Sequence, residues 1–414
     1  MSAENFSSDA TVNGANKKRL RIAVLSRNFV PTAGGAERYA IAMVEQLALQ
    51  HDITVFSQSI EHSWPNVVYK KVSSPLKRPR WVNQLWFASL TWWATRRGFD
   101  IVHSHENTWH GNVQTVHVMP VQHNLFKNQT GQTKSRQLLV WLRVLTSPRL
   151  MVYLSIEHFR YAPQRGRRVV VTSPMLLEVF KACFPAAADI TSVVTPGIKV
   201  LPVEQAQANQ VDKANQADRR RLLGLPQAGE CLLFVGNDYK KKGLQTLLEA
   251  LTKLPLDVAL AVVGASRQTG FFKQQAVVLG LENRVFFLGA LTDMAPAYRA
   301  ATCLVHPTRE DTFAMVVLEA MAFGLPVVVS NAEYCGISAL LKHCKNALLL
   351  RNPLDADELA QMVSMVLVSS ELRTGLGQQA RSFAECFDWR KLAIAQEAIY
   401  FDAVKGISHE TSND

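Results

Sequence analysis

Short apolar runs typical of strands alternate along this chain with segments whose apolar residues have helical spacing, and both halves of the chain show this alternation. Short aliphatic and β-branched runs, such as residues 20–26, 53–56 and 231–236, are bounded by glycine, proline or polar residues. Segments with helical spacing follow many of these runs. A run that is apolar on both faces is typical of a parallel strand covered by helices on both sides. The pattern therefore predicts an α/β fold built from two units of alternating strands and helices.

The predicted elements divide the chain into segments with different roles. Further strands are expected at residues 100–105, 112–117, 169–173, 258–264, 285–289, 303–307 and 327–330, and helices at 39–50, 244–253, 294–301 and 388–404. The expected organisation is an extension at 1–18, a first domain at 19–200, a linker at 201–228, a second domain at 229–387 and a final helix with tail at 388–414. The extension is polar and lacks the apolar core of a secretory signal, so we expect it to be disordered.

Residues 306–330 form the most informative stretch. Asp311 and Thr312 are typical helix-entry residues, and Gly324 with Pro326 is a typical helix exit. The β-branched run that follows suits a buried parallel strand. Backbone N–H groups at such a helix entry can face a ligand and favour its anionic part.

Glu319 does not fit the apolar face of this helix, where its neighbours at i±3 and i±4 are Met315, Val316, Ala322 and Phe323. Because an unpaired buried charge is costly, Glu319 needs a partner, and we expect that partner to be a ligand.

The second acid of this stretch, Asp311, lies eight residues before Glu319, or about 12 Å along a helix. Two acids so spaced can hold the two ends of one elongated polar ligand. The alternative is that Asp311 caps the helix and Glu319 belongs to a buried salt bridge.

Two other loops have the composition of phosphate-binding loops. Gly34 and Gly35 follow the first strand and precede a helix, so the backbone there can approach a ligand closely. Lys240, Lys241 and Lys242 follow the strand at 231–236, at the strand end where α/β sheets bind ligands. The alternative for both loops is an ordinary solvated turn.

Three histidines lie at or next to predicted strands: His103, His105 and His117. A zinc site is one interpretation, but the spacing fixes no third ligand. His103 and His105 alternate with strand period, which favours structural roles for both.

The charge is unevenly distributed. The chain carries +11 overall, but residues 1–200 hold 24 basic against 11 acidic side chains, or +13, whereas residues 201–414 carry −2. A basic half suggests an anionic partner: nucleic acid, a membrane or a phosphorylated substrate. Residues 77–97 and 126–149 mix basic residues with tryptophan and leucine, as interfacial helices do. Core helices are the alternative, and no nucleic-acid recognition motif accompanies the charge.

Other composition signals mainly exclude classes of protein. No apolar run of about 20 residues is present, so we expect no membrane span. The six cysteines form no Cys-x-x-Cys pair, which argues against a metal or disulfide framework and favours a reducing cytoplasm.

The chemistry-bearing motifs resemble those of one family. Asp311-x7-Glu319, followed by Ala-Met-Ala-Phe-Gly-Leu-Pro-Val, resembles the E-x7-E element of the retaining glycosyltransferases of family GT4, with Asp in place of the first Glu. The segment from Gly236 to Gly243 is similar to the G-x-x-x-x-[RK]-K-G element of that family, and residues 195–197 are similar to its interdomain element. The resemblance implies the GT-B fold, two Rossmann-like domains facing a central cleft, with the final helix crossing back to the first domain.

The resemblance also implies roles for individual residues. By analogy the catalytic group comprises His117 and Asp311 beside the donor sugar and Lys242 on the diphosphate. The donor-binding residues implied are Gly34 and Gly35 at the sugar and phosphates, Lys241 in support of Lys242, the backbone near Phe287 and Leu288 at the base, Thr312, Phe313 and Ala314 at the helix entry, and Glu319 at the ribose. The spacing favours Asp311 over Glu310 for the sugar contact.

The function implied is transfer of a hexose, glucose in the most similar members, from a UDP-sugar to a lipopolysaccharide or related cell-surface glycan. The resemblance implies no cofactor and no metal, and a cytoplasmic enzyme bound peripherally to the anionic inner face of the plasma membrane. Its partners would be the nucleotide-sugar donor and a glycolipid or polysaccharide acceptor, with no nucleic acid. A GT-B UDP-sugar epimerase and, further away, a nucleic-acid-binding protein are the alternatives.

Overall fold

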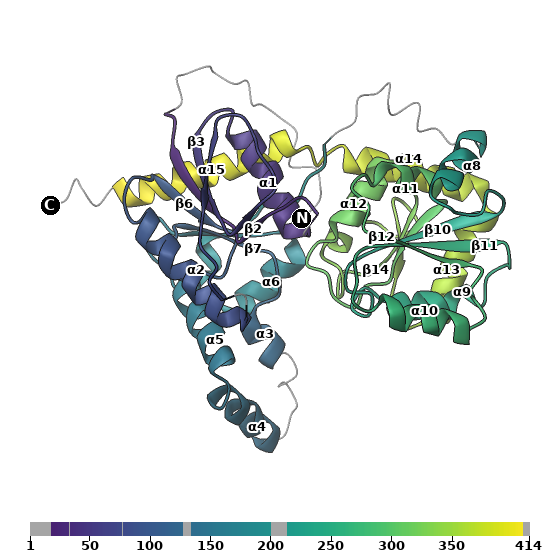
Figure 1. Cartoon of the computed structure of the whole chain (residues 1–414), viewed down its shortest axis with the longest axis horizontal. Helices are drawn as coiled ribbons and strands as arrows, with labels where there is room; N and C mark the ends of the chain where they lie inside the picture. Colours follow the sequence, from purple (N-terminus) through teal and green to yellow (C-terminus); the bar gives the residue numbers. More distant parts are fainter. Residues whose placement is uncertain (1–17, 33, 77, 127–133, 200–212, 409–414) are drawn as a thin grey trace.

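The computed structural model describes residues 18–32, 34–76, 78–126, 134–199 and 213–408, which form two α/β units side by side (Figure 1). Most of the predicted N-terminal extension, the last residue of the predicted first domain (Val200), the first part of the predicted linker (residues 201–212), and Lys77 and Lys127 lie outside the described residues.

The first half contains a seven-stranded parallel sheet in the order β5-β3-β1-β6-β7-β8-β9. Its strands are β1 Arg21–Leu25, β3 Asp52–Ser57, β5 Val67–Lys71, β6 Ile101–Ser104, β7 Val113–Val116, β8 Arg168–Val171 and β9 Thr191–Val193, with a small ladder of β2 Asn28–Phe29 and β4 Ser59–Ile60 beside them. The helices are α1 Gly35–Leu47, α2 Arg80–Thr95, α3 Val121–Phe126, α4 Lys134–Leu145, α5 Pro148–Tyr161, α6 Pro174–Cys183 and the 3-10 helix η2 Pro185–Ile190.

The second half contains a six-stranded parallel sheet in the order β12-β11-β10-β13-β14-β15. Its strands are β10 Glu230–Val235, β11 Val258–Val263, β12 Val285–Gly289, β13 Cys303–His306, β14 Val327–Ser330 and β15 Leu348–Leu350. Its helices are α8 Lys213–Leu222, α9 Leu244–Leu251, α10 Thr269–Val278, α11 Ala295–Ala300, α12 Met315–Ala322, η3 Gly336–Leu340, α13 Ala356–Val368 and α14 Ser370–Ala384.

Strand β11 shows why the continuous apolar runs become central strands. All six of its residues are buried, and alternate side chains enter two different cores. Leu260 and Val262 pack into the core on one face of the sheet, whereas Ala261 and Val263 pack into the core on the other. Both faces are therefore covered by helices, as the sequence pattern predicts.

The last helix, α15 Trp389–Ser408, belongs spatially to the first sheet and not to the second, and Figure 1 shows it running beside α1 and β6. Trp389 and Tyr400 are buried in the same apolar core as Tyr39 of α1. The crossing is held by backbone hydrogen bonds from Ile198 N to Phe387 O (2.8 Å) and from Trp389 N to Ile198 O (3.3 Å).

The predicted interfacial helix across residues 126–149 is not one element. Helix α3 ends at Phe126, residues 127–133 lie outside the described residues, and α4 with α5 forms a bent pair in which α4 occupies the tip of the first half (Figure 1). Among the described residues no single helix is long and apolar enough to cross a membrane. The pair Leu138–Leu145 and Pro148–Tyr161 passes that test of length and composition only jointly, with a 96° bend between its two parts.

Candidate active site

The loops that follow the strands of both sheets meet at a cleft of about 650 Å³. Parallel strands bring their carboxyl ends to one edge of a sheet, and ligand loops gather there. Most of the residues singled out in the sequence line this cleft: Gly34, Gly35, His117, Lys241, Lys242, Asp311, Thr312, Phe313, Ala314 and Glu319. They come from both halves of the chain, so the cleft lies between the two sheets.

The glycine loop forms the first-domain wall of the cleft at the N-terminus of α1. Gly34 occupies the N-cap position in extended backbone, and no side chain caps the helix. The Glu37 carboxylate takes the N–H of its own residue, so the N–H groups of Gly35 and Ala36 keep their capacity to bind an anion. A Cβ on Gly35 would lie 3.5 Å from the Met315 sulfur, so this loop approaches helix α12 of the second domain closely.

Lys241 and Lys242 face this loop from the second domain. Their position depends on Gly243, which has a φ of +80° and lies so close to Pro307 that a Cβ would be 1.9 Å from the proline carbonyl oxygen. Only glycine tolerates both conditions. Lys241 pairs with Glu310 at 2.7 Å, and Lys242 pairs with Asp311 at 2.5 Å.

Asp311 is the most strongly held acid of the cleft. Its Oδ2 atom contacts Lys242 and, at 3.2 Å, the fully buried His306, while its Oδ1 atom accepts the N–H groups of Phe313 (3.3 Å) and Ala314 (2.9 Å). Burial alone would raise the pKa of this carboxyl, but the Lys242 ammonium and His306 outweigh burial and hold the pKa far below its usual range. Asp311 is therefore ionised at every physiological pH.

The helix begins later than the sequence predicts. Helix α12 starts at Met315, and its N-cap is Ala314 with a φ of +70°, not Asp311 or Thr312. The hydrogen bonds from Phe313 and Ala314 to the Asp311 side chain hold these residues in a turn before the helix. The assumption of eight helical residues between the two acids, on which the expected separation of about 12 Å was based, is therefore wrong.

Glu319 has the protein partners that the sequence did not reveal. Its Oε1 atom pairs with Arg38 of helix α1 at 2.7 Å, and its Oε2 atom accepts the Tyr298 hydroxyl at 2.7 Å. Burial, followed by the negative charge of Glu319, raises the pKa of Tyr298 well above its usual value. The expectation that a ligand is the first partner of Glu319 is wrong, because Arg38 and Tyr298 already satisfy the charge across the cleft.

The three histidines form a buried hydrogen-bond network. His103 contacts the hydroxyls of Tyr400 and Thr115, each at 2.6 Å, and His105 Nδ1 lies 2.9 Å from His117 Nε2. Burial lowers the pKa of His103 and of His117 to about 3, and that of His105 well below its usual value. All three are neutral at pH 7, so His117 can donate or accept hydrogen bonds but carries no charge. Across the described residues, no group of three or more His, Cys, Asp and Glu side chains is arranged to hold a metal ion.

A hydrogen bond across the cleft links the two domains beside His117. The Thr312 hydroxyl donates to the backbone carbonyl of His117 at 2.7 Å. Phe313 and Ala314, the next two residues, are almost completely buried in the core of the second domain. The helix entry is thus fixed on one side by a core and on the other by the first domain.

Phe287 and Leu288 are not among the residues that line the cleft. They lie within strand β12, where Phe287 packs against the core that contains Tyr239 and Leu288 packs against the opposite core. The cleft is lined instead by the loop that follows this strand, at Ala290, Leu291 and Thr292.

Three residues of the site had no role assigned from the sequence: Arg38, Tyr298 and His306. Arg38 follows the glycine loop by one helical turn and pairs with an acid 281 positions away. His306 directly precedes the Pro307 loop and lies beneath Asp311. Arg38 and His306 lie close in sequence to the predicted ligand loops, and this could have marked them as site residues. The residues that they contact could not be predicted from the sequence.

Comparison with known proteins identifies the family. The model of the family "Glycosyltransferase Family 4" matches residues 33–200, and that of "Glycosyl transferases group 1" matches residues 215–383. The chain is 25% identical over 240 residues to the lipopolysaccharide glucosyltransferase WaaG of Escherichia coli K12, which covers 57% of this chain and 62% of that protein. It is 28% identical over 232 residues to a D-inositol 3-phosphate glycosyltransferase of Corynebacterium glutamicum, covering 53% of this chain and 54% of that protein.

Solved structures share the fold over almost the whole chain. The crystal structure of WaaG, described as a glycosyltransferase involved in lipopolysaccharide biosynthesis, matches with a TM-score of 0.76 at 21% identity, covering 91% of this chain and 98% of that one. The Anabaena protein Alr3699/HepE in complex with UDP-glucose matches with a TM-score of 0.69 at 18% identity. This match covers 94% of this chain and 100% of the HepE chain. The two family models and the two Rossmann-like domains agree, and the chain is a glycosyltransferase that belongs to the GT4 family and has the GT-B fold.

Proposed function

We propose that this enzyme transfers a hexose, glucose as the first choice, from a UDP-sugar to a lipopolysaccharide or related cell-surface glycan, with retention of the anomeric configuration. The carrying observation is that two lysines and two acids of the second domain converge on one cleft with the N-terminus of helix α1 of the first domain. WaaG, a lipopolysaccharide glucosyltransferase by name, and the UDP-glucose complex of HepE support this choice.

The diphosphate of the donor would bind between the two domains. Lys241 and Lys242 would approach from one side, and the N–H groups of Gly35 and Ala36 at the start of α1 would approach from the other. In the protein without ligand each lysine is held by an acid, so an entering diphosphate competes with Glu310 and Asp311 for these cations. As the bond to the sugar breaks, negative charge grows on the leaving diphosphate, and pre-positioned cations stabilise it.

The sugar and the ribose would occupy the two ends of the cleft. Asp311 would accept hydrogen bonds from sugar hydroxyls, since its carboxylate stays ionised and is oriented by four protein groups. Glu319 would accept the ribose hydroxyls while it remains bound to Arg38 and Tyr298, because a carboxylate offers about four lone-pair sites. The base would lie against the loop at Leu291 and Thr292, which lines the cleft.

His117 would act as a neutral hydrogen-bonding group beside the sugar. Its pKa of about 3 makes it a poor proton acceptor at pH 7, so general-base catalysis by its imidazole is not part of the proposal. Its ring is held by His105 and by edge contact with Tyr39, which fixes its orientation. The reaction as proposed uses charge stabilisation and positioning, with no metal or cofactor.

The charge and surface of the first domain support the proposed acceptor and location. Its charge of +13 and its exposed Trp141 on helix α4 suit an anionic membrane surface, where a lipid-borne phosphorylated glycan would be presented. We therefore propose a cytoplasmic enzyme bound peripherally to the inner face of the plasma membrane.

The experiment uses the full chain with UDP-glucose, UDP-galactose, GDP-mannose and ADP-glucose, each followed for slow hydrolysis. We expect turnover with a UDP-sugar and calorimetric binding of UDP. Addition of truncated lipopolysaccharide should accelerate turnover, and NMR of the product should show the donor anomeric configuration. Preference for another base, or inversion, would contradict the proposal, and conversion of the UDP-sugar without any acceptor would favour an epimerase.

A further inference from the structure

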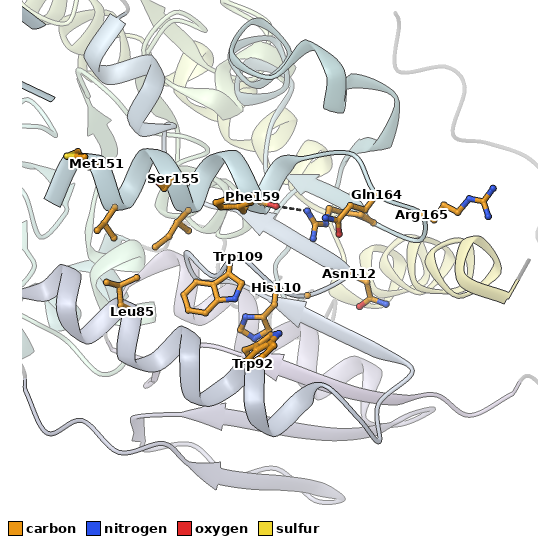
Figure 2. A pocket seen from close by; sticks show the side chains of 14 residues that line it. Leu85, Trp92, Trp109, His110, Asn112, Met151, Ser155, Phe159, Gln164 and Arg165 are labelled. Atoms are coloured by element: carbon orange, nitrogen blue, oxygen red, sulfur yellow. Dashed lines mark hydrogen bonds between the residues drawn. The ribbon is translucent and has the colours of Figure 1, made fainter. Parts of the chain in front are cut away.

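A second cavity of about 910 Å³ lies in the first domain, between helices α2 and α5 (Figure 2). Leu85 and Trp92 of α2 form one wall, Met151, Ser155 and Phe159 of α5 form the other, and Trp109 with His110 lies between them. Its volume falls in the range of small-molecule sites, about 300–1,000 Å³.

The cavity exists because one connection of the sheet has no helix. Strands β6 and β7 are parallel neighbours, yet residues 105–112 between them contain no helical turn. In most parallel sheets a crossover helix would cover this position. Here the flanking helices α2 and α5 come from other parts of the chain, and they leave a gap above Trp109 and His110.

The two ends of the cavity differ in chemistry. Figure 2 shows Leu85 and Met151 at one end and Asn112, Gln164 and Arg165 at the other. The walls between them are mainly apolar. The cavity therefore matches a molecule with an apolar chain and a polar head, and not a sugar, which needs polar groups along its whole length.

The polar end contains groups that the protein leaves without partners. Arg167 is 5% exposed and donates from Nη1 to the carbonyls of Phe159 (2.6 Å) and Ala162 (2.9 Å), but its Nε has no hydrogen-bond partner among the described residues. Between the two walls, neither ring nitrogen of His110 has a partner among the described residues either. Burial is the cause that lowers the pKa of Arg167, and no ion pair with a described carboxylate opposes it. A buried cation in this state favours an anionic ligand.

The open side of the cavity is apolar and aromatic. Trp92, Met151 and Phe159 line it and are each about half exposed, at 47%, 46% and 59%. Trp93, next to Trp92, is 65% exposed, and the Arg96 guanidinium lies 5.7 Å from its ring centre. Tryptophan beside arginine is the composition of a surface that meets lipid head groups.

We propose that this cavity binds one alkyl chain of an anionic membrane lipid, with the head group at Arg167 and Arg165 and the chain along the apolar walls of α2 and α5. The site is separate from the nucleotide-sugar cleft. Asn112 at its polar end hydrogen-bonds Val102 N and Arg168 N near the amino ends of the strands, whereas His117 of the cleft follows the carboxyl end of β7.

The first test is calorimetric titration of the full chain with sodium decanoate below its micelle-forming concentration. We expect saturable binding of one decanoate that is unaffected by UDP. Ser155→Trp fills the cavity from an exposed position and should weaken binding by roughly tenfold or more, or about 1.4 kcal/mol. The matched control is His158→Trp, on an exposed position of the same helix outside the cavity, which should bind as the wild type does.

The second test concerns the head group. Decyltrimethylammonium carries the same chain with a cation and should bind at least about tenfold more weakly than decanoate. Arg165→Gln should reduce the difference in affinity between decanoate and decyltrimethylammonium. Arg149→Gln, exposed at the other end of α5, should leave that difference unchanged. Absence of saturable decanoate binding, equal binding by Ser155→Trp, or equal binding of the cation would each overturn the proposal.

Whether the bound alkyl chain comes from a membrane lipid is tested with vesicles of phosphatidylcholine containing phosphatidylglycerol. If the lipid enters from the membrane, Ser155→Trp should co-sediment less than His158→Trp at the same salt concentration. Equal co-sedimentation of the two variants would overturn the membrane origin, even where decanoate binds. Sugar-nucleotide turnover is measured in parallel, so a failure of the proposed function is recognised separately.

Discussion

The two domains share one architecture but differ in what their surfaces offer. Among the described residues, the exposed large aromatic side chains of the first half are Trp64, Trp86, Trp92, Trp93, Trp141 and Phe159, whereas the second half has Phe271 alone. The first half carries +13 and the second −2. The second domain instead holds its charges in pairs at the cleft, as Lys242 and Asp311 show. The same sheet-and-helix plan therefore presents a cleft with paired charges in one domain and a basic, aromatic surface in the other.

The difference extends to the interior. The first domain buries the network of His103, His105 and His117 without any acidic partner, whereas His306 in the second domain is buried against Asp311. A neutral histidine network is stable only while it stays unprotonated. The two domains should therefore respond differently to acid, and this gives the largest expected effect.

We expect the first domain to lose stability below about pH 6.5. The unfolded chain binds protons at these histidines below that pH, whereas in the folded domain the pKa of His103 and of His117 is lowered to about 3. Each such histidine should cost roughly 1.4 kcal/mol of unfolding free energy per pH unit, so three should cost about 4 kcal/mol near pH 5.5. Asp311 behaves differently, because its pKa is lowered in the folded protein. Its contribution to the free energy of unfolding is kept until the pH falls below about 4.

Hydrogen exchange at pH 7.5, 6.5 and 5.5 would measure this, strand by strand. Protection should fall in β6 and β7 before it falls in β10 and β13. His117→Gln should reduce the pH slope by about one proton, while His158→Gln, on an exposed position, should leave it unchanged. Loss of protection at the same pH in both domains, or no loss of protection in either domain above pH 4, would show that the two domains do not differ in their sensitivity to acid.

The second prediction concerns the charges of the second domain. Lys242→Ala should lower kcat/KM by roughly 10²–10³-fold, because in the proposed reaction the lysine stabilises charge that develops on the leaving diphosphate. UDP affinity should fall less, since the ground-state diphosphate also contacts Lys241 and the α1 N-terminus. Steady-state kinetics and calorimetry separate the two effects.

The matched control is Lys240→Ala in the same loop, an exposed residue outside the cleft. It should keep activity within about twofold, since surface charges contribute little. Turnover of Lys242→Ala close to that of Lys240→Ala would mean that Lys242 serves only to neutralise Asp311.

The third prediction concerns the contact between the domains at Glu319. Glu319→Ala should weaken UDP binding by roughly ten- to a hundredfold, corresponding to the loss of charged hydrogen bonds worth about 1.5–3 kcal/mol. Because the Tyr298 hydroxyl would lose its acceptor, Glu319→Gln is the cleaner variant: it keeps an acceptor for Tyr298 but removes the charge. Glu333→Ala, an exposed acid outside the cleft, is the control. Unchanged UDP affinity in both Glu319 variants would assign Glu319 to the interdomain ion pair alone.

The smallest expected effect concerns the exposed face of the first domain. The full chain should bind vesicles containing phosphatidylglycerol, and binding should weaken as salt rises. Arg143→Gln on α4 should lower vesicle affinity by about 1 kcal/mol, or roughly fivefold, whereas Lys345→Gln in the second domain should change nothing. Hydrogen exchange should slow near Trp141 on binding. Equal effects of the two substitutions would show that charge alone, and not the first-domain face, directs the enzyme to anionic lipid.

The sequence by itself determined the plan of the molecule. Apolar runs such as Val258–Val263 are buried on both faces, and their period and length depend only on neighbours along the chain. The same holds for the phosphate-type loops, because glycine and lysine act through local backbone geometry and charge. Gly34, Lys242, Asp311 and Glu319 could therefore be selected from the sequence, and the structure brings all four to one cleft.

The tertiary structure alone decided which of these groups touch one another. Arg38 meets Glu319, and Thr312 meets the His117 carbonyl, across gaps of 281 and 195 positions that no local pattern encodes. The tertiary structure also creates the cavity between α2 and α5. This cavity arises because no crossover helix lies between β6 and β7 and because the two flanking helices come from distant parts of the chain. Partners of this kind depend on how two domains and several helices pack together, and packing is set by the whole chain, whereas helices, strands and loops follow from residues close in sequence.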